Sequence, residues 1–229
     1  MNGTCGKRTT QARGADAGGI EGIGAEKLNK DTTERAPMII TISGTPGSGK
    51  STIARMLAER LGYAHRSAGE FMREMAKKRN RTLAELADVA RTDSSIDEEI
   101  DQRTIEYARR EDNFVIDSRL GWYFIPKAGK APLRILLMVG EEVAAQRIYG
   151  AKRPEEKENT SLEETRKHTR LRLASEKERY RNSYGVDYTD PANHDIVIDT
   201  SARGPEQVVK EILAAMEKKG FYTKSRSGK

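Results

Sequence analysis

The chain has 229 residues, of which 36% are hydrophobic and 33% are charged, and its formal net charge is +6. This length and apolar content fit one α/β domain with its own core, and no apolar run reaches the roughly 18 residues of a membrane-spanning helix. The single cysteine, Cys5, excludes an intrachain disulfide or a cysteine zinc cluster, and the lack of an apolar signal sequence predicts a cytoplasmic location.

Residues 1–37 are rich in glycine, threonine and charge and contain few large apolar side chains. Such a segment buries too little surface to offset the entropy lost on ordering, so we expect a disordered N-terminal extension. Met38 directly precedes the first predicted strand, so the extension is either a misassigned start or a regulatory tail. The domain is expected to occupy residues 38–220, followed by a small basic tail at 221–229.

A glycine-rich loop follows the first apolar run, Ile39–Ile42, and precedes a helical pattern. The loop has the spacing G-x-x-x-x-G-K-[ST], in which glycine backbones approach phosphates and the following helix N-terminus favours negative charge. We expect Lys50 to reach the β- and γ-phosphates and Ser51 to offer its hydroxyl to Mg²⁺. The residues expected to contact ATP here are Gly44, Thr45, Pro46, Gly47, Ser48, Gly49, Lys50, Ser51 and Thr52.

Strand and helix patterns alternate along the rest of the chain. Strands are predicted at 38–43, 63–66, 113–117, 133–139 and 195–199, and helices at 49–61, 70–78, 83–91, 95–110, 141–149, 162–182 and 205–218. Ser95 with Glu98 predicts a capping box at the start of one helix. The order indicates a three-layer P-loop NTPase fold, α/β, with a five-stranded parallel sheet and ligands at the carboxyl ends of its strands.

Two inserts interrupt this alternation: a helical insert at about 67–112 and a short charged segment at about 150–170. Arginines lie at the junctions of the predicted elements, and Arg172 and Arg179 are seven residues apart on one face of a long helix. The other arginines of this group are Arg73, Arg119, Arg147 and Arg153. Guanidinium groups of this kind suit phosphoryl transfer between two anions, and a solvated surface role is the alternative for each of them.

Other uses of a triphosphate fit the chain less well. A GTPase would need an NKxD motif after the P-loop, and the only similar stretch, Asn29-Lys30-Asp31, lies upstream of the loop. A large ATPase motor would usually carry an acidic pair after the third strand, where Asp117 is followed by Ser118. The triphosphate is therefore expected to be a phosphoryl donor.

Several longer segments carry a specific resemblance. They read MIITISGTPGSGKST, RSAGEFMREMA, SIDEEIDQRTIEYAR, VIDSRLGW, RLASEKERY and YGVD, and they extend over most of residues 38–215. On these segments the chain resembles the nucleoside monophosphate kinases, and within them the archaeal-type (type 2) cytidylate kinases.

The resemblance implies roles for individual residues. Asp117 and Arg119 match a D-x-R motif whose acid organises the phosphate and metal region and whose arginine contacts the acceptor. Arg172, Glu176 and Arg179 resemble an R-x-x-x-D-x-x-R pattern, with glutamate in place of aspartate, which leaves a direct sugar contact by Glu176 open.

The remaining implied contacts lie in the two inserts. Arg73 and Ser67 belong to the insert at 67–112, which the resemblance implies to be the monophosphate-binding region. Arg147 and Arg153 fall where such kinases place the arginines of a lid, here the segment 150–170, which has no cysteines for a structural zinc. Among all these residues the catalytic set is expected to be Lys50, Asp117, Arg119 and Arg153, with Arg147 on the ATP side.

The implied reaction is ATP + CMP (or dCMP) → ADP + CDP (or dCDP), with Mg²⁺ and a monomeric enzyme. No general base is needed, because the acceptor is already a phosphate dianion, and the three histidines, His65, His168 and His194, are expected to be packing or surface residues. We favour core packing over base stacking for Trp122 and Tyr123. The alternatives are a kinase of this fold acting on AMP, UMP or another small acceptor, and a nucleotide-dependent RNA-binding or regulatory module suggested by the basic charge. Nucleic acid is the less favoured partner.

Overall fold

The computed structural model describes residues 38–90, 92–151 and 160–221, and all of them belong to the same compact unit. The expected disorder of residues 1–37 concerns residues outside this set, and residues 222–229 of the predicted basic tail lie outside it as well. Across the described residues, each helix is too short or too polar to cross a membrane.

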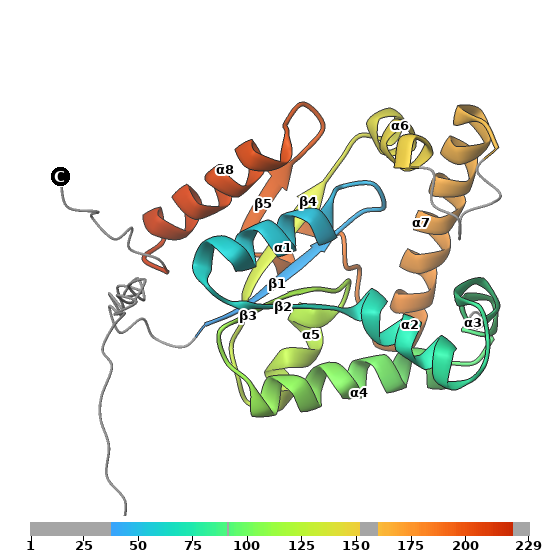
Figure 1. The fold of residues 1–229 in the computed structure, drawn as a ribbon, viewed down its shortest axis with the longest axis horizontal. Helices are drawn as coiled ribbons and strands as arrows, with labels where there is room; N and C mark the ends of the chain where they lie inside the picture. The colour runs from blue at the N-terminus through green and yellow to red at the C-terminus, as the bar shows by residue number, and fades with distance from the viewer. Residues whose placement is uncertain (1–37, 91, 152–159, 222–229) are drawn as a thin grey trace, which may run out of the picture. The chain divides into compact units, whose positions relative to one another are not determined.

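Five parallel strands form one sheet in the order β2-β3-β1-β4-β5, which confirms the predicted sheet (Figure 1). The strands are β1 (Ile39–Gly44), β2 (Ala64–Ser67), β3 (Phe114–Asp117), β4 (Leu133–Met138) and β5 (Ile196–Asp199). The helices are α1 (Lys50–Leu61), α2 (Ala68–Lys78), α3 (Leu83–Val89), α4 (Ser95–Arg110), α5 (Gly121–Phe124), α6 (Glu141–Ala151), α7 (Leu162–Tyr184) and α8 (Pro205–Lys218), with 3₁₀ turns at Ile125–Ala128 and Pro191–Asn193.

The central strands are buried on both faces, as a sheet covered by two helical layers requires. Ile40 and Ile42 of β1 pack with α1 and α8, whereas Ile39 belongs to a cluster with Phe114 and Ile116 on the α4 side. These neighbours divide between the two faces because successive strand side chains point in opposite directions. Figure 1 shows α1 and α8 on one side of the sheet and α4 and α5 on the other.

The strand register gathers the carboxyl ends at one edge of the sheet. Asp117, the last residue of β3, is level with Ser67 of β2 and Ile42 of β1. Gly44 of β1 is level with Leu137 of β4. The start of the glycine-rich loop, Asp117 and Ser67 therefore all lie at the carboxyl-terminal edge of the sheet.

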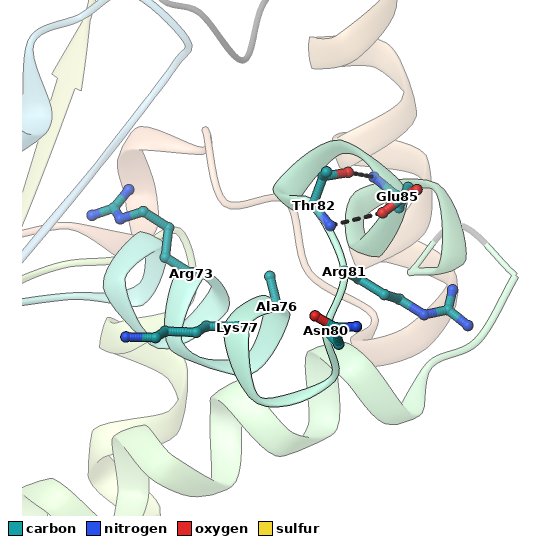
Figure 2. Close-up of a pocket in the computed structure, with 7 residues that line it drawn as sticks. All are labelled: Arg73, Ala76, Lys77, Asn80, Arg81, Thr82 and Glu85. Atoms are coloured by element: carbon teal, nitrogen blue, oxygen red, sulfur yellow. Dashed lines mark hydrogen bonds between the residues drawn. The ribbon is translucent and has the colours of Figure 1, made fainter.

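The insert between β2 and β3 contains α2, α3 and α4 and has a small core of its own, which includes Met75, Leu86, Ile96 and Ile100. The junction of α2 and α3 bounds a hollow of about 500 Å³. Its lining residues are Arg73, Ala76, Lys77, Asn80, Arg81, Thr82 and Glu85. Figure 2 shows Arg73 and Arg81 extending to opposite sides, so the charged groups do not converge in this hollow.

The capping box predicted at Ser95 is wrong. Ser94 is the N-cap of α4, and its helical φ of −64° and ψ of −19° do not allow a side-chain bond to the helix backbone; its hydroxyl donates to Glu98 Oε1 at 2.9 Å instead. The capping box forms at α3, where Glu85 N donates to Thr82 Oγ1 at 3.2 Å and Thr82 N donates to Glu85 Oε2 at 2.7 Å (Figure 2).

Candidate active site

Two glycines of the glycine-rich loop have a left-handed backbone conformation. Gly47 and Gly49 have φ values of +77° and +85°, in the left-handed region that other residues rarely adopt. A Cβ on Gly47 would also lie 2.8 Å from Ala144 Cα of α6, whereas a Cβ on Gly49 would meet nothing within 4 Å. The loop is therefore packed against α6 at Gly47 and open at Gly49.

Backbone contacts hold this loop against the sheet edge. Thr45 N donates to Leu137 O of β4 at 3.3 Å, and Thr200, just after β5, donates its hydroxyl to Ser48 O at 3.3 Å. The buried hydroxyl oxygens of Thr45 and Ser48 have no hydrogen-bond partner among the described residues. A buried polar oxygen without a partner is costly, so these two groups mark a place prepared for a polar ligand.

Lys50 begins α1 and folds back over the loop. Its Nζ donates to Gly44 O at 2.8 Å and to Thr45 O at 3.0 Å. Burial, and after it the positive charge of Arg119, lower the pKa of Lys50 to about 7 against the opposing effect of Glu176. The positive charges of Lys50 and Arg119 act on each other, so this part of the protein favours an anion.

Asp117 connects the loop to the insert. Its Oδ2 accepts from Ser51 Oγ at 2.6 Å and from Ser67 Oγ at 3.1 Å, and its Oδ1 lies 2.9 Å from His65 Nε2. Because a carboxylate can only accept, Nε2 of the imidazole carries the proton in this contact. The side chain of Arg73 lies near Ser67. Both approach Gly69: a Cβ built on Gly69 would be 3.4 Å from Ser67 Oγ and 3.5 Å from Arg73 Nη1.

The oxygens of Ser51 and Asp117 fit the ligand chemistry of Mg²⁺. They are hard oxygen donors at the mouth of the loop, and Mg²⁺ in phosphate sites usually takes one or two protein oxygens together with phosphate oxygens and water. No group of three or more His, Cys, Asp or Glu side chains in the described segments is arranged to hold a metal. Ser51 and Asp117 could supply one or two oxygen ligands to a Mg²⁺ ion whose other ligands are phosphate oxygens and water.

Arg119 follows β3 and forms a two-pronged ion pair with Glu176 of α7. Its Nε donates to Glu176 Oε2 and its Nη2 donates to Oε1, both at 2.7 Å. Its backbone carbonyl accepts from Ser43 Oγ and from Trp122 Nε1, both at 3.0 Å. Both the side chain and the main chain of Arg119 are thus held in place.

The arginines of α7 separate into two environments. Arg172 joins the Arg119–Glu176 pair, because its Nε donates to Glu176 Oε1 at 3.0 Å. Arg179 instead pairs with Asp97 of α4 at 3.2 Å and donates to Ala90 O at 3.4 Å. Helix periodicity places both arginines on one face of α7, but in the fold Arg179 contacts the insert and Arg172 contacts Glu176.

Arg147 of α6 contacts both the glycine-rich loop and the segment after β5. It donates to Thr200 O at 2.6 Å, to Thr200 Oγ1 at 3.0 Å and to Gly47 O at 3.4 Å. It therefore joins the glycine-rich loop to the segment after β5. Arg153, expected in the catalytic set, lies outside the described residues.

Sequence reasoning missed three side chains at this site. His65, which the sequence predicts to be a packing or surface residue, contacts Asp117. Its position two residues before Ser67 is the one sequence feature that could have indicated this contact. Tyr188 donates to Glu176 Oε2 at 2.9 Å, and Thr200 contacts the loop; neither carries a motif. Trp122 packs in an aromatic cluster and is 7% exposed, which confirms core packing.

Comparisons with known proteins agree with this geometry. The sequence profile of the cytidylate kinase-like family matches residues 39–202. The cytidylate kinase of Halobacterium salinarum is 39% identical over 182 residues, which are 79% of this chain and 90% of that protein. The cytidylate kinase of Methanocaldococcus jannaschii is 39% identical over 181 residues, 79% of this chain and 98% of that protein.

Solved structures show the same fold at lower identity. Shikimate kinase from Bacteroides thetaiotaomicron matches with a TM-score of 0.58 at 18% identity, over 80% of this chain and 99% of that one. Shikimate kinase from Acinetobacter baumannii gives a TM-score of 0.56 at 16% identity, over 81% and 96%. These identities bear on the fold alone, and the family follows from the sequence matches: the chain belongs to the cytidylate kinase-like family.

Proposed function

We propose that the protein transfers the γ-phosphoryl group of ATP to CMP or dCMP and releases ADP and CDP or dCDP. Three of its sequence relatives carry the name cytidylate kinase, which supports this acceptor class. The observation that carries the proposal is that Asp117 joins the two sites: its Oδ2 accepts from Ser51 of the loop at 2.6 Å and from Ser67, at the start of the insert, at 3.1 Å. A donor phosphate and an acceptor phosphate can therefore approach each other.

On the donor side, the loop amides and Lys50 bind the β- and γ-phosphates, and Arg147 holds the loop to the segment after β5. The carbonyls of Gly44 and Thr45 now hold the Lys50 ammonium, and a phosphate oxygen would replace them as the stronger, charged acceptor. Ser51 and Asp117 would hold Mg²⁺, which would neutralise phosphate charge when bound.

On the acceptor side, Arg119 faces the incoming monophosphate, and Arg73, Ser67, Arg172 and Arg179 complete the substrate site. The acceptor oxygen already carries negative charge, so no side chain has to remove a proton. The catalytic contribution of the chain is then alignment of the two phosphates and stabilisation of charge in the transition state. Arg119 contributes most because its partner fixes its orientation.

The inserts would have separate roles in this scheme. The insert at 67–112 would bind the acceptor, because it supplies Ser67 and Arg73 and is tied to α7 through the Asp97–Arg179 pair. The segment at 150–170, with Arg153, would cover the phosphates; residues 152–159 lie outside the described set. All the proposed contacts come from one chain, so the proposal requires no second copy.

A coupled ADP-release assay with ATP, Mg²⁺ and each of CMP, dCMP, UMP and AMP tests the proposal. We expect turnover with CMP or dCMP to exceed that with AMP and UMP, and to disappear in Lys50→Ala. Phosphorylation of AMP without turnover of CMP or dCMP would refute the proposed acceptor. ATP hydrolysis that is independent of any monophosphate, together with salt-sensitive RNA binding, would instead favour a regulatory module.

A further inference from the structure

The carboxylate of Glu176 is the most heavily bonded side chain near the acceptor arginine. It accepts from Arg119 Nε and Nη2, from Arg172 Nε and from the hydroxyl of Tyr188. Four donors occupy about the four lone-pair positions that a carboxylate offers. A sugar hydroxyl approaching Glu176 would therefore have to displace a protein donor.

The charge of this carboxylate is firmly maintained. Burial alone would raise the pKa of Glu176, but the charges of Arg119 and Arg172 and their hydrogen bonds lower it to about 2. Burial and the negative charge of Glu176 raise the pKa of Tyr188, which keeps its hydroxyl protonated. Tyr188 therefore acts only as a donor to Glu176.

The side chain of Tyr188 is held in place by burial and by its neighbours. Its side chain is 0% exposed, and its ring packs edge-on against Tyr180 at 5.6 Å between centroids. The flanking turn is held as well, because Asp187 Oδ1 accepts from Thr189 N and Oγ1, and Asp187 Oδ2 lies 3.0 Å from Lys177 Nζ of α7.

Stability alone does not account for this arrangement. Buried ion pairs are often neutral or unfavourable relative to well-packed apolar side chains, so a network of this kind points to a functional demand. That demand is visible in Arg119, whose Nε and Nη2 are bound by Glu176, while no described residue accepts a hydrogen bond from its Nη1. The network thus fixes the plane of the guanidinium and leaves one of its nitrogens for a ligand.

We infer that Glu176 and Tyr188 are positioning residues that hold Arg119 for the acceptor phosphate, and that Glu176 does not read the sugar 2′-hydroxyl. The inference rests on the proposed function, since it assigns how that site orients its acceptor. It extends the substrate site by one residue, Tyr188, and predicts that ribo- and deoxyribonucleotide acceptors respond alike to changes at Glu176.

Tyr188→Phe is the first test, because it removes the hydroxyl and keeps the ring. We expect KM for CMP to rise about five- to tenfold, the range for the loss of one hydrogen bond of ordinary strength, with KM for ATP unchanged. Tyr184→Phe is the matched control: Tyr184 lies in the same aromatic cluster, but its hydroxyl donates to Asp101 rather than Glu176, and it should leave KM for CMP unchanged. An equal rise in both KM values, or no rise, would overturn the inference.

A double-mutant cycle tests whether Tyr188 acts through Arg119. In an Arg119→Lys background, which lacks the two-pronged pair, Tyr188→Phe should change the dissociation constant for CMP by less than twofold. Calorimetry measures this constant even where turnover is low. Fully additive effects would show that Tyr188 acts elsewhere and would refute its positioning role.

Glu176→Gln separates positioning from sugar recognition. We expect kcat/KM for CMP and for dCMP to fall by the same factor, about tenfold or more, because both acceptors depend on Arg119. A loss confined to CMP would show that Glu176 reads the 2′-hydroxyl and would overturn the inference. Failure of the proposed function would be visible in the unmodified protein as absent turnover of CMP and dCMP, whereas failure of this inference is visible only in the variants.

Discussion

The donor and acceptor halves of the proposed site are built in different ways. The donor loop is continuous in sequence, and its shape depends on glycine backbone conformations and main-chain contacts such as Thr45 N to Leu137 O. The acceptor side is assembled from side chains far apart in sequence, since Arg119 and Glu176 are 57 positions apart. One half is encoded by local backbone geometry, and the other by a tertiary ion-pair network.

This difference determines how each half should respond to change. A donor loop shaped by backbone is sensitive to a single added Cβ, and its chemistry depends on one lysine. An acceptor arginine that depends on its partners can be weakened from several positions without contact with the ligand. Four substitutions follow in order of expected effect: the first three separate these two behaviours, and the fourth tests a buried carboxyl group of α4 outside both halves.

Lys50→Ala should have the largest effect. Removing the cation from the transferring phosphoryl group should reduce kcat by about 3 to 4 kcal/mol of transition-state stabilisation, several hundredfold. Steady-state kinetics with saturating ATP and CMP measures the loss. Lys210→Ala, at an exposed lysine of α8, is the control and should keep normal kcat. Retention of most activity in Lys50→Ala would contradict the donor assignment.

Arg119→Ala should break the acceptor half selectively. We expect kcat/KM for CMP to fall about 100-fold, roughly 2.7 kcal/mol, while the ATP dissociation constant changes less than twofold. Glu176 would be left buried with a weaker set of partners, so circular dichroism must show that the variant folds. Equal losses for both substrates would mean that the halves are not separable.

Gly47→Ala should show that the donor loop depends on its backbone. Left-handed φ costs a residue with a Cβ about 1 to 2 kcal/mol, and the added methyl would also press on Ala144. We expect the free energy of unfolding to fall by about 2 kcal/mol in urea denaturation. Gly49→Ala has a similar φ without the contact and should lose only about 1 kcal/mol. Equal losses of unfolding free energy in the two variants would show that the contact with α6 does not contribute to the effect of Gly47→Ala.

Asp101→Asn should have the smallest effect and a pH-dependent one. Burial raises the pKa of Asp101 to about 7; the hydrogen bond from Tyr184 opposes the rise, and the charge of Asp97 adds to it. The folded state therefore binds more protons than the unfolded state between about pH 4 and 7, and this group makes stability fall as pH rises through that range.

The asparagine variant lacks this titration. It should be more stable than the unmodified protein at pH 8, by about 1 kcal/mol, and nearly equal to it at pH 4. Thermal or urea unfolding at the two pH values measures the difference. A stability gain that is the same at both values would show that the carboxyl group is not titrating in this window.

The same contrast explains what the sequence could predict. The five strands and most helix bounds were recoverable because apolar periodicity is local, and the loop was recoverable because its motif is contiguous. The arginines proposed for the acceptor side were selected by residue type and resemblance, and the sequence did not predict their partners. Helix periodicity cannot tell that Arg179 pairs with Asp97 of α4, or that Tyr188 bonds Glu176 across a turn.

The contact between Trp122 and the carbonyl of Arg119 has a practical consequence. The sequence contains one tryptophan, so all indole emission from the unmodified protein originates beside the acceptor arginine. Indole emission responds to the polarity and hydrogen bonding around its N–H group. Addition of CMP should therefore shift the fluorescence maximum, and the chain carries its own optical reporter for occupation of one half of its active site.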